Sequence, residues 1–176
     1  QRTTPSAGFI HAYDNSVHGF ALHKKNNGDA ASCTDCHSSH QIIKGIDSRS
    51  SVFKLNIPNT CGKCHSNVQK EFTESIHGQL VAKGNGDAPS CTNCHGEHNI
   101  LKTDDPNSPV AFQNFSSEIF SPFHESMKLS EKYGISANRY KTFSQSYHGL
   151  ALSGGSASVA NCGSCHGVHN IKPSSD

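Results

Sequence analysis

The eight cysteines of this 176-residue chain form four copies of one pattern, Cys-x-x-Cys-His. The copies begin at Cys33, Cys61, Cys91 and Cys162, and no cysteine is left over. This spacing is typical of the attachment site of a c-type haem, in which both thiols bond to the porphyrin and the histidine ligates the iron. The pattern therefore predicts four covalently bound haem c groups.

The pattern also predicts which residue carries which role. The thioether cysteines are Cys33, Cys36, Cys61, Cys64, Cys91, Cys94, Cys162 and Cys165, and the proximal histidines are His37, His65, His95 and His166. A zinc knuckle or a redox dithiol can use a Cys-x-x-Cys pair, but neither needs a histidine in the fifth position four times out of four. A disulfide framework would not gather the cysteines so regularly into close pairs.

Composition agrees with a core supplied by cofactor. Only 33% of residues are hydrophobic and there is no tryptophan, so a core made of side chains alone would be thin. We expect an apo-chain that is largely unfolded until haem is attached. The formal charge is +1 and the basic residues form no stripe along the sequence, which gives no support to nucleic-acid binding. No apolar run is long enough to span a bilayer.

Location is predicted from the cofactor and from the N-terminus. Haem is attached to c-type cytochromes after export in bacteria, and the chain begins at Gln1 rather than methionine. We therefore expect a signal peptide to have been removed and the protein to be extracellular or at the cell surface, with the periplasm as the alternative.

Three segments of the chain repeat one another, at about residues 14–72, 73–143 and 144–176. Each has a Ser-x-His-Gly sequence, a Cys-x-x-Cys-His pattern 14 or 15 residues after that histidine, and a further histidine three residues beyond the pattern. The first two continue into Asp-x-x-Ser-x-Val. We interpret residues 1–176 as a single tetrahaem domain with internal repeats.

The second repeat lacks the second haem site that the first repeat has at Cys61. Residues 119–124 stand in its place, and His124 falls opposite His65 if one inserted residue is allowed. We interpret this segment as a degenerate haem site, in which Phe115, Phe120 and Phe123 fill the space of a porphyrin.

The predicted fold class is mainly α with extensive irregular loops and little or no β-structure. Helices are predicted over residues 66–83, 123–133 and 136–151, the last with Ser136 as its N-cap. Each Ser-x-His-Gly histidine is then expected near a helix C-terminus, with its glycine as a left-handed cap. The single methionine, Met127, is interpreted as a packing residue.

Two sets of histidines are candidates for the second axial ligand of each iron. The Ser-x-His-Gly histidines are far enough along the chain to cover a haem from the opposite side. The histidines three residues after a proximal one cannot reach the far face of the same haem and are expected to serve neighbouring haems. The two sets are His18, His77 and His148, and His40, His98 and His169. His124 ranks next, and His11 and His23 are interpreted as incidental.

The chain resembles the repeated multihaem cytochromes c of anaerobic metal- and sulfur-metabolising bacteria. The resemblance is carried by Ser-x-His-Gly, Cys-x-x-Cys-His-Gly-x-His-x-Ile and Asp-x-x-Ser-x-Val, with Thr-Cys-Gly-Lys-Cys-His at Thr60 and Lys-Tyr-Gly-Ile-Ser at Lys132. It implies electron transfer along closely spaced bis-histidine haems. The chain is also similar in size to tetrahaem subunits of extracellular cytochrome filaments.

The expected function is therefore electron transfer without substrate chemistry, so the protein is predicted not to be an enzyme. The expected partners are redox proteins or terminal extracellular acceptors, with a homopolymer in which haems meet between subunits as one variant and a soluble carrier as the other. The alternative is a multihaem oxidoreductase of the nitrite, hydroxylamine or sulfite type, or a redox sensor. Either alternative needs one iron with an open axial position.

Overall fold

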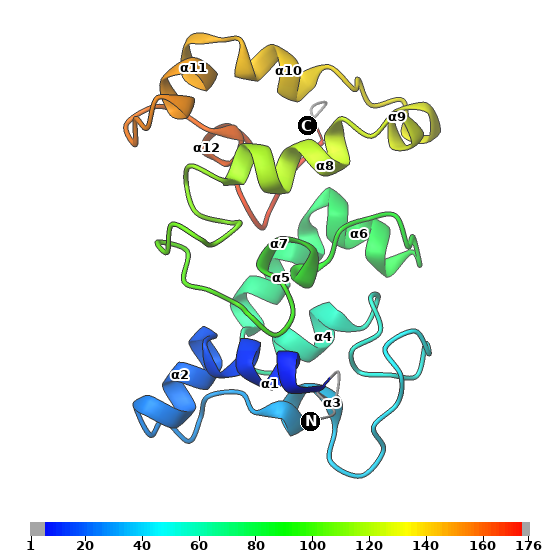
Figure 1. Ribbon diagram of the computed structural model, residues 1–176. Coiled ribbons are helices and arrows are strands. Elements are labelled where there is room, and N and C mark those ends of the chain that lie inside the picture. Colours follow the sequence, from blue (N-terminus) through cyan, green and yellow to red (C-terminus); the bar gives the residue numbers. More distant parts are fainter. Residues whose placement is uncertain (1–5, 174–176) are drawn as a thin grey trace. The chain divides into compact units, whose positions relative to one another are not determined.

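The computed structural model describes residues 6–173 as helices joined by irregular loops, with no β-strand in that range (Figure 1). The mainly-α prediction is confirmed for this part of the chain. The chain divides into two compact units, residues 1–102 and residues 103–176, and the boundary lies inside the second predicted repeat. None of the helices of residues 6–173 is long and apolar enough to cross a bilayer.

The helices of both units are short. Those of the first unit are α1 (Ser6–Asp14), α2 (Val17–Lys24), α3 (Cys33–His37), α4 (Ile57–Gly62), α5 (Ser66–Glu74), α6 (Ile76–Ala82) and α7 (Cys91–His95). The second unit begins with a π-helical turn, η1 (Phe115–Phe120), followed by α8 (Ser121–His124), α9 (Met127–Tyr133), α10 (Arg139–Ser144), α11 (Tyr147–Ser153) and α12 (Cys162–His166).

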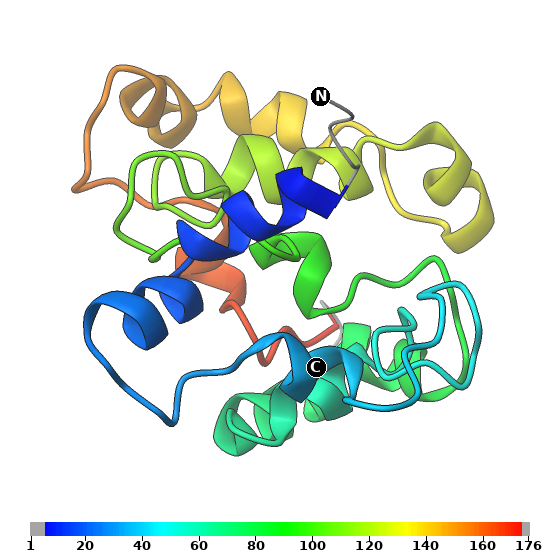
Figure 2. The ribbon, with the colours of Figure 1, turned by 60° about the horizontal axis from the view of Figure 1, so that its bottom comes forward.

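In the first unit, the N-terminal helices lie against the segment that follows α7, as both ribbon views show (Figures 1 and 2). The Val17 amide donates a hydrogen bond to the Ile100 carbonyl at 2.8 Å, and the Phe9 ring lies 4.8 Å from that of His98. Residues more than 80 positions apart are thus held together, which places residues 98–100 of repeat two against the N-terminal helices of the first unit.

Each Ser-x-His-Gly sequence starts a helix, so the prediction that it ends one is wrong. The serine is the N-cap of α2, α6 or α11, and its hydroxyl accepts a hydrogen bond from the amide of the glycine three residues later, at 3.0–3.3 Å. Serine in this position satisfies an amide that the helix itself leaves without a partner. The histidine is consequently the second residue of the helix, on its first turn.

The glycine of this sequence is required because a backbone carbonyl of the preceding helix lies too close for a Cβ atom, and not because its backbone is left-handed. A Cβ atom built on Gly78 would lie 1.9 Å from the Phe72 carbonyl oxygen, and one on Gly149 would lie 2.1 Å from that of Phe143. Neither residue has a positive φ. The helix before the serine therefore packs end-on against the first turn of the next helix, and any larger residue would separate the two.

This arrangement explains why the predicted long helices are interrupted. The helix expected over 66–83 divides at Ser75 into α5 and α6, and the one expected over 136–151 divides at Ser146 into α10 and α11. The cap predicted at Ser136 is wrong, because α10 begins after Asn138. Within 123–133 the chain forms α9, capped by Ser126. Met127 is 64% exposed and does not pack in a core.

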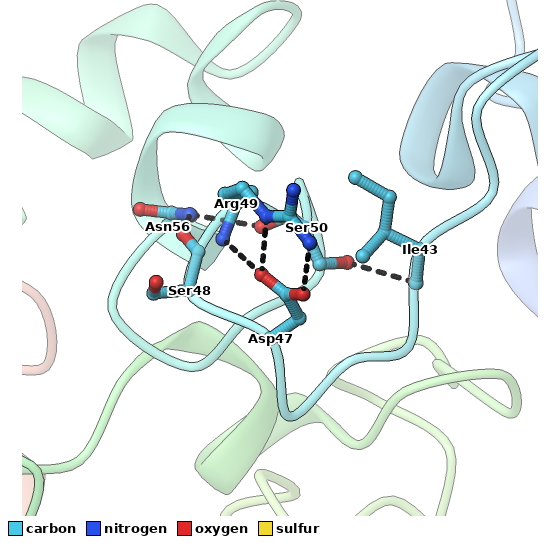
Figure 3. A network of polar contacts seen from close by, with 6 residues as sticks. All are labelled: Ile43, Asp47, Ser48, Arg49, Ser50 and Asn56. Carbon is cyan, nitrogen blue, oxygen red and sulfur yellow. Dashed lines mark hydrogen bonds and ion pairs between the residues drawn. The ribbon is translucent and has the colours of Figure 1, made fainter.

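The Asp-x-x-Ser-x-Val sequence builds a loop that both repeats share. In repeat one, Asp47 binds Arg49, the Ser50 hydroxyl donates to the Ile43 carbonyl, and the Asn56 amide donates to two loop carbonyls at 2.8 Å (Figure 3). In repeat two, Asn114 donates to two loop carbonyls in the same way, at 2.9 Å. The Asp-x-x-Ser-x-Val sequence therefore has a structural role, which is to shape the loop before α4 and η1.

The apolar core of the described residues is small, as composition predicts. Its most buried hydrophobic members include Ile57, Val81 and Leu152, while the largest fully buried side chains are serines. Several large apolar side chains lie outside, among them Phe9 at 56% and Leu150 at 62% exposed.

Candidate functional site: four Cys-x-x-Cys-His patterns

Three of the four Cys-x-x-Cys-His patterns form one-turn helices of the same construction. These are α3, α7 and α12, each of which begins at the first cysteine and ends at the histidine. One helical turn places the two cysteines three residues apart on the same side. The arrangement presents both sulfurs of a pattern in one direction, which is what a single porphyrin edge requires.

The intervening residues of these patterns close the helix at its start. The backbone amide before the first cysteine donates to the side chain of the third residue of the helix, which is Asp35, Asn93 or Ser164, at 2.7–3.1 Å. Capping boxes of this kind hold a short helix that would not form alone. The sequence alone predicted no role for these three residues. Their short polar side chains at the same position were the signal that could have identified them.

The second pattern is built differently. It begins inside α4 and its histidine, His65, precedes α5. The Lys63 ammonium donates to the Asp35 carbonyl at 3.1 Å, and the Ser51 hydroxyl donates to the Cys36 carbonyl. These hydrogen bonds tie the second pattern and the loop before it to α3. Neither Lys63 nor Ser51 was predicted to have a role in the site.

None of the eight cysteines forms a disulfide, and three of the first unit, Cys36, Cys61 and Cys91, lie near one another. The Cys61 thiol forms a hydrogen bond with Cys91, which raises the pKa of Cys61 and lowers that of Cys91. Burial raises the pKa of the Cys36 thiol, and the nearby Cys61 raises it further. Burial raises the pKa of Cys94 to about 11. The second and third patterns thus present their first sulfurs to the same place.

Within residues 6–173, no three side chains of the histidine, cysteine, aspartate or glutamate type converge on one point that could hold a metal ion. A zinc knuckle needs four converging ligands. An iron inside a porphyrin needs only two protein ligands, one on each face, because the porphyrin supplies the other four. The donor set in the structure is compatible with the second kind of site.

Two histidines of the Cys-x-x-Cys-His patterns, His37 and His65, each have the ring of a second histidine about 6 Å away. The ring centroids of His37 and His98 are 5.9 Å apart with their planes 6° from parallel, and those of His18 and His65 are 6.2 Å apart. A metal–imidazole bond is about 2 Å long and the ring centre lies roughly 1.2 Å further, so two imidazoles on one iron have centroids about 6 Å apart. Both pairs have the spacing of a bis-histidine iron.

The histidines of these pairs come from the two predicted sets. His18 belongs to Ser-x-His-Gly and His98 to the set that follows a proximal histidine by three residues. Burial lowers the pKa of His18, and the neighbouring His65 lowers it further. A lowered pKa favours the neutral imidazole, which is the form that binds a metal.

The other predicted distal ligands lie as follows. His77 is half-buried on the first turn of α6, and burial lowers its pKa. His148 is exposed at the equivalent position of α11 and contacts the Tyr147 ring. His169 lies after α12 and is half-buried, and His40 lies in the loop after α3 and is exposed. Among the described residues, neither His40 nor His148 has a second histidine ring beside it as His37 and His65 do.

The remaining motif histidines differ in their surroundings. His95, at the end of α7, is half-buried. His166, at the end of α12, is exposed, and its ring contact is with Phe120 at 6.5 Å and 20°. His11 is hydrogen-bonded to Asn15, and His23 lies 3.5 Å from Asp14. Both contacts are local, in agreement with the interpretation of His11 and His23 as incidental.

The segment interpreted as a degenerate haem site packs against the fourth pattern. Phe115 lies over Gly163, the Cys162 amide donates to the Ser116 hydroxyl at 3.2 Å, and the Phe120 ring stacks on that of His124 at 4.0 Å. Aromatic side chains therefore do fill the space beside this pattern. The π-helical turn η1 holds one residue more per turn than an α-helix, which matches the one inserted residue that the repeat alignment needs.

A hollow of about 390 Å³ lies beside the first pattern. It is lined by residues 37–41 together with Ile43 and residues 49–51, so that His37 and His40 both border it.

No protein-family model, curated protein or solved structure matches this chain.

Proposed function

We propose that this protein transfers electrons through four c-type haems, bound covalently at its four Cys-x-x-Cys-His patterns. The observation that carries the proposal is the spacing of two motif histidines from a second histidine, 5.9 Å for His37 and His98 and 6.2 Å for His18 and His65. A haem closed on both faces cannot bind a substrate at iron, so its chemistry is limited to gaining and losing an electron.

The residues of the chain then have assignable parts. Cys33 and Cys36 hold the first haem, and His37 and His98 would close its iron. Cys61 and Cys64 hold the second, which His65 and His18 would close. The haem on Cys91 and Cys94 takes His95, the haem on Cys162 and Cys165 takes His166, and His77, His148 and His169 stay candidates for further axial positions.

Contact between the Cys61 and Cys91 sulfurs supports electron transfer between haems. Thioether sulfurs are bonded to the porphyrin edge, so two haems attached at adjacent sulfurs have their edges close together. Exposed apolar side chains such as Phe9 and Phe20 would be covered by porphyrin. The proposed partners are redox proteins or extracellular acceptors, and the proposed location is outside the cytoplasm, at the cell surface or in the periplasm.

The test is spectroscopy of protein made in a host with the haem-attachment machinery. We expect a mass increased by four haems and EPR signals of low-spin iron. His98→Ala and His18→Ala should each convert one haem to a high-spin form that binds carbon monoxide after reduction. His23→Ala is the matched control, because His23 is exposed and bound only to its own helix pair, and it should change nothing.

Two results would reject the proposal. If the chain binds zinc and no haem under these conditions, the proposed cofactor is wrong. Haem that stays low-spin in both His98→Ala and His18→Ala would remove the ligand assignment and with it the argument from spacing.

A further inference from the structure

The loop between the first two Cys-x-x-Cys-His patterns presents an arginine beside the first of them. The Arg49 Nε–H and one Nη–H donate to the two carboxylate oxygens of Asp47, at 3.0 and 2.7 Å (Figure 3). Two residues later, the Ser51 hydroxyl donates to the Cys36 carbonyl of α3. The loop is thus fixed against α3, and the bidentate pair orients the guanidinium on it.

The hollow of about 390 Å³ beside α3 is suited to an anion. Among the described residues, Arg49 is the only permanently charged side chain that lines it, and no carboxylate does. Ser38, Ser39 and Gln41 also line it, and their side chains make no hydrogen bond with the described residues. The pair with the aspartate uses two of the five guanidinium N–H groups and leaves the others. Positive charge and unused donors together indicate a negatively charged acceptor.

The loop itself does not need a guanidinium to fold. Repeat two has Asn107 at the position of Arg49. Asp105 accepts hydrogen bonds from the Asn107 backbone amide at 2.8 Å and from its side-chain amide at 3.2 Å, as Asp47 accepts them from the backbone and side chain of Arg49. A side-chain amide therefore satisfies this carboxylate. What arginine adds in repeat one is a positive charge and further donors at the edge of the hollow.

We propose that Arg49 binds a propionate of the haem attached at Cys33 and Cys36, and that Asp47 orients it for this role. The inference rests on the proposed function, because it needs a haem at this pattern. Thioether bonds form at one edge of a porphyrin, and the propionates leave the opposite edge. The hollow borders His37 and neither cysteine, as a site for the propionate edge requires. A carboxylate also matches the planar fork of a guanidinium, which can donate two parallel hydrogen bonds to it.

The charge of Arg49 should raise the reduction potential of this haem. Reduction removes one positive charge from the iron, so a cation beside the propionates favours the reduced form. Arg49→Asn, which copies repeat two, should shift the one-electron equilibrium toward the oxidised form by roughly threefold to tenfold, a fall of about 30–60 mV. Arg49→Lys keeps the charge without the fork and should produce a smaller fall.

The test is a redox titration of holoprotein in which the first haem is followed alone. In His98→Ala this haem is expected to be high-spin, so its EPR signal separates it from the other three. Adding Arg49→Asn to this variant should lower the potential of the high-spin haem and leave the others unchanged. Lys44→Gln is the matched control, because Lys44 is an exposed cation of the same loop that does not line the hollow, and it should shift the potential less. A high-spin haem whose potential is the same with and without Arg49→Asn would overturn the proposal.

A further variant separates the charge of Arg49 from that of the carboxylate it leaves behind. Asp47→Asn is combined with Arg49→Asn in the same His98→Ala protein, and the lowered potential should persist. If the potential instead returns to that of His98→Ala alone, the unpaired Asp47 caused the fall and the propionate contact is wrong. A merely structural role for Arg49 would lower the midpoint of thermal unfolding and leave all four potentials unchanged.

A free anion in the hollow is the competing outcome. The titration is therefore repeated in inorganic phosphate and in chloride at equal ionic strength. A propionate is part of the bound haem, so phosphate should have no specific effect. If phosphate shifts the potential of the first haem with Arg49 present and not in Arg49→Asn, the hollow takes a free anion and the proposal is overturned. Failure of the proposed function has a different signature, because haem would be missing or His98→Ala would give no high-spin signal.

Discussion

Ser38 holds a backbone conformation that belongs to glycine. It follows the first Cys-x-x-Cys-His helix with φ 68° and ψ 166°, and the residues in the equivalent positions are Gly96, with φ 79° and ψ −176°, and Gly167, with φ 73° and ψ −177°. A residue with a Cβ atom in this region costs about 1–3 kcal/mol. Ser38 is exposed and its hydroxyl makes no hydrogen bond with the described residues, so the side chain gives nothing in return.

We therefore expect Ser38→Gly to stabilise the holoprotein. Glycine relieves strain of roughly 2 kcal/mol but costs about 0.5–1 kcal/mol through the greater freedom of the unfolded chain, which leaves a gain of about 1 kcal/mol. For a chain of this length, 1 kcal/mol corresponds to a rise of about 2–4 °C in the midpoint of thermal unfolding. Far-UV circular dichroism follows the helices, and the Soret band follows ligation of haem by its histidines.

Two control variants separate strain from other effects of glycine. Gly167→Ser makes the reverse change where a Cβ atom would meet nothing closer than 3.9 Å, and it should lower the free energy of unfolding by about 1 kcal/mol. Ser39→Gly changes a neighbouring residue whose φ is not positive, and it should be destabilising by about 0.5 kcal/mol. If Ser38→Gly lowers the midpoint as Ser39→Gly does, the argument from strain is wrong.

Three further substitutions test the construction of the repeats by the same unfolding assay. Gly78→Ala places a Cβ atom 1.9 Å from a backbone carbonyl oxygen and should lower the free energy of unfolding by more than about 3 kcal/mol. The control Gly86→Ala, where a Cβ atom has nothing within 4 Å, should change stability little, and equal effects would contradict the close approach. Ser146→Ala removes an N-cap and should cost about 1 kcal/mol, and no loss would mean that the cap is not needed. Ile57→Ala, at 7% exposure, should cost about 2–4 kcal/mol and Ile46→Ala, at 86%, less than about 0.5; a reversed order would place the core elsewhere.

What could be predicted from sequence were the features carried by fixed spacing, while the haem chemistry stays a prediction. The Cys-x-x-Cys-His patterns, the mainly helical fold and the one-residue insertion at 119–124 all follow from counting positions. The contact between His37 and His98 could not be predicted, because it depends on how residues 73–102 pack against repeat one, and the role of His98 as a haem ligand stays a prediction. That contact is made between residues far apart in the chain, and no local pattern encodes it.

Local rules failed where two signals competed. A glycine after a helical stretch indicates a C-cap, and a serine before one indicates an N-cap. In Ser-Ile-His-Gly at Ser75 both readings are available, and the tertiary structure selects the second because the preceding helix packs against Gly78 too closely for any other residue. The histidine consequently lies on a first turn that is held by the serine cap before it and by the close packing at the glycine after it.

Residues 115–124 indicate how a chain that binds the proposed haems could lose one of them and keep its fold. The turn η1 covers the same six repeat positions as α4, offset by 58 residues, and both follow a loop closed by an asparagine amide. In η1 the cysteine is replaced by Ile119, which is 8% exposed, and Phe120 stacks on His124. Apolar side chains thus supply burial that a porphyrin edge would supply in repeat one. If the proposed haems are bound, each haem site is part of the core, and losing one requires side chains of comparable area together with a change in helical winding that accommodates the inserted residue.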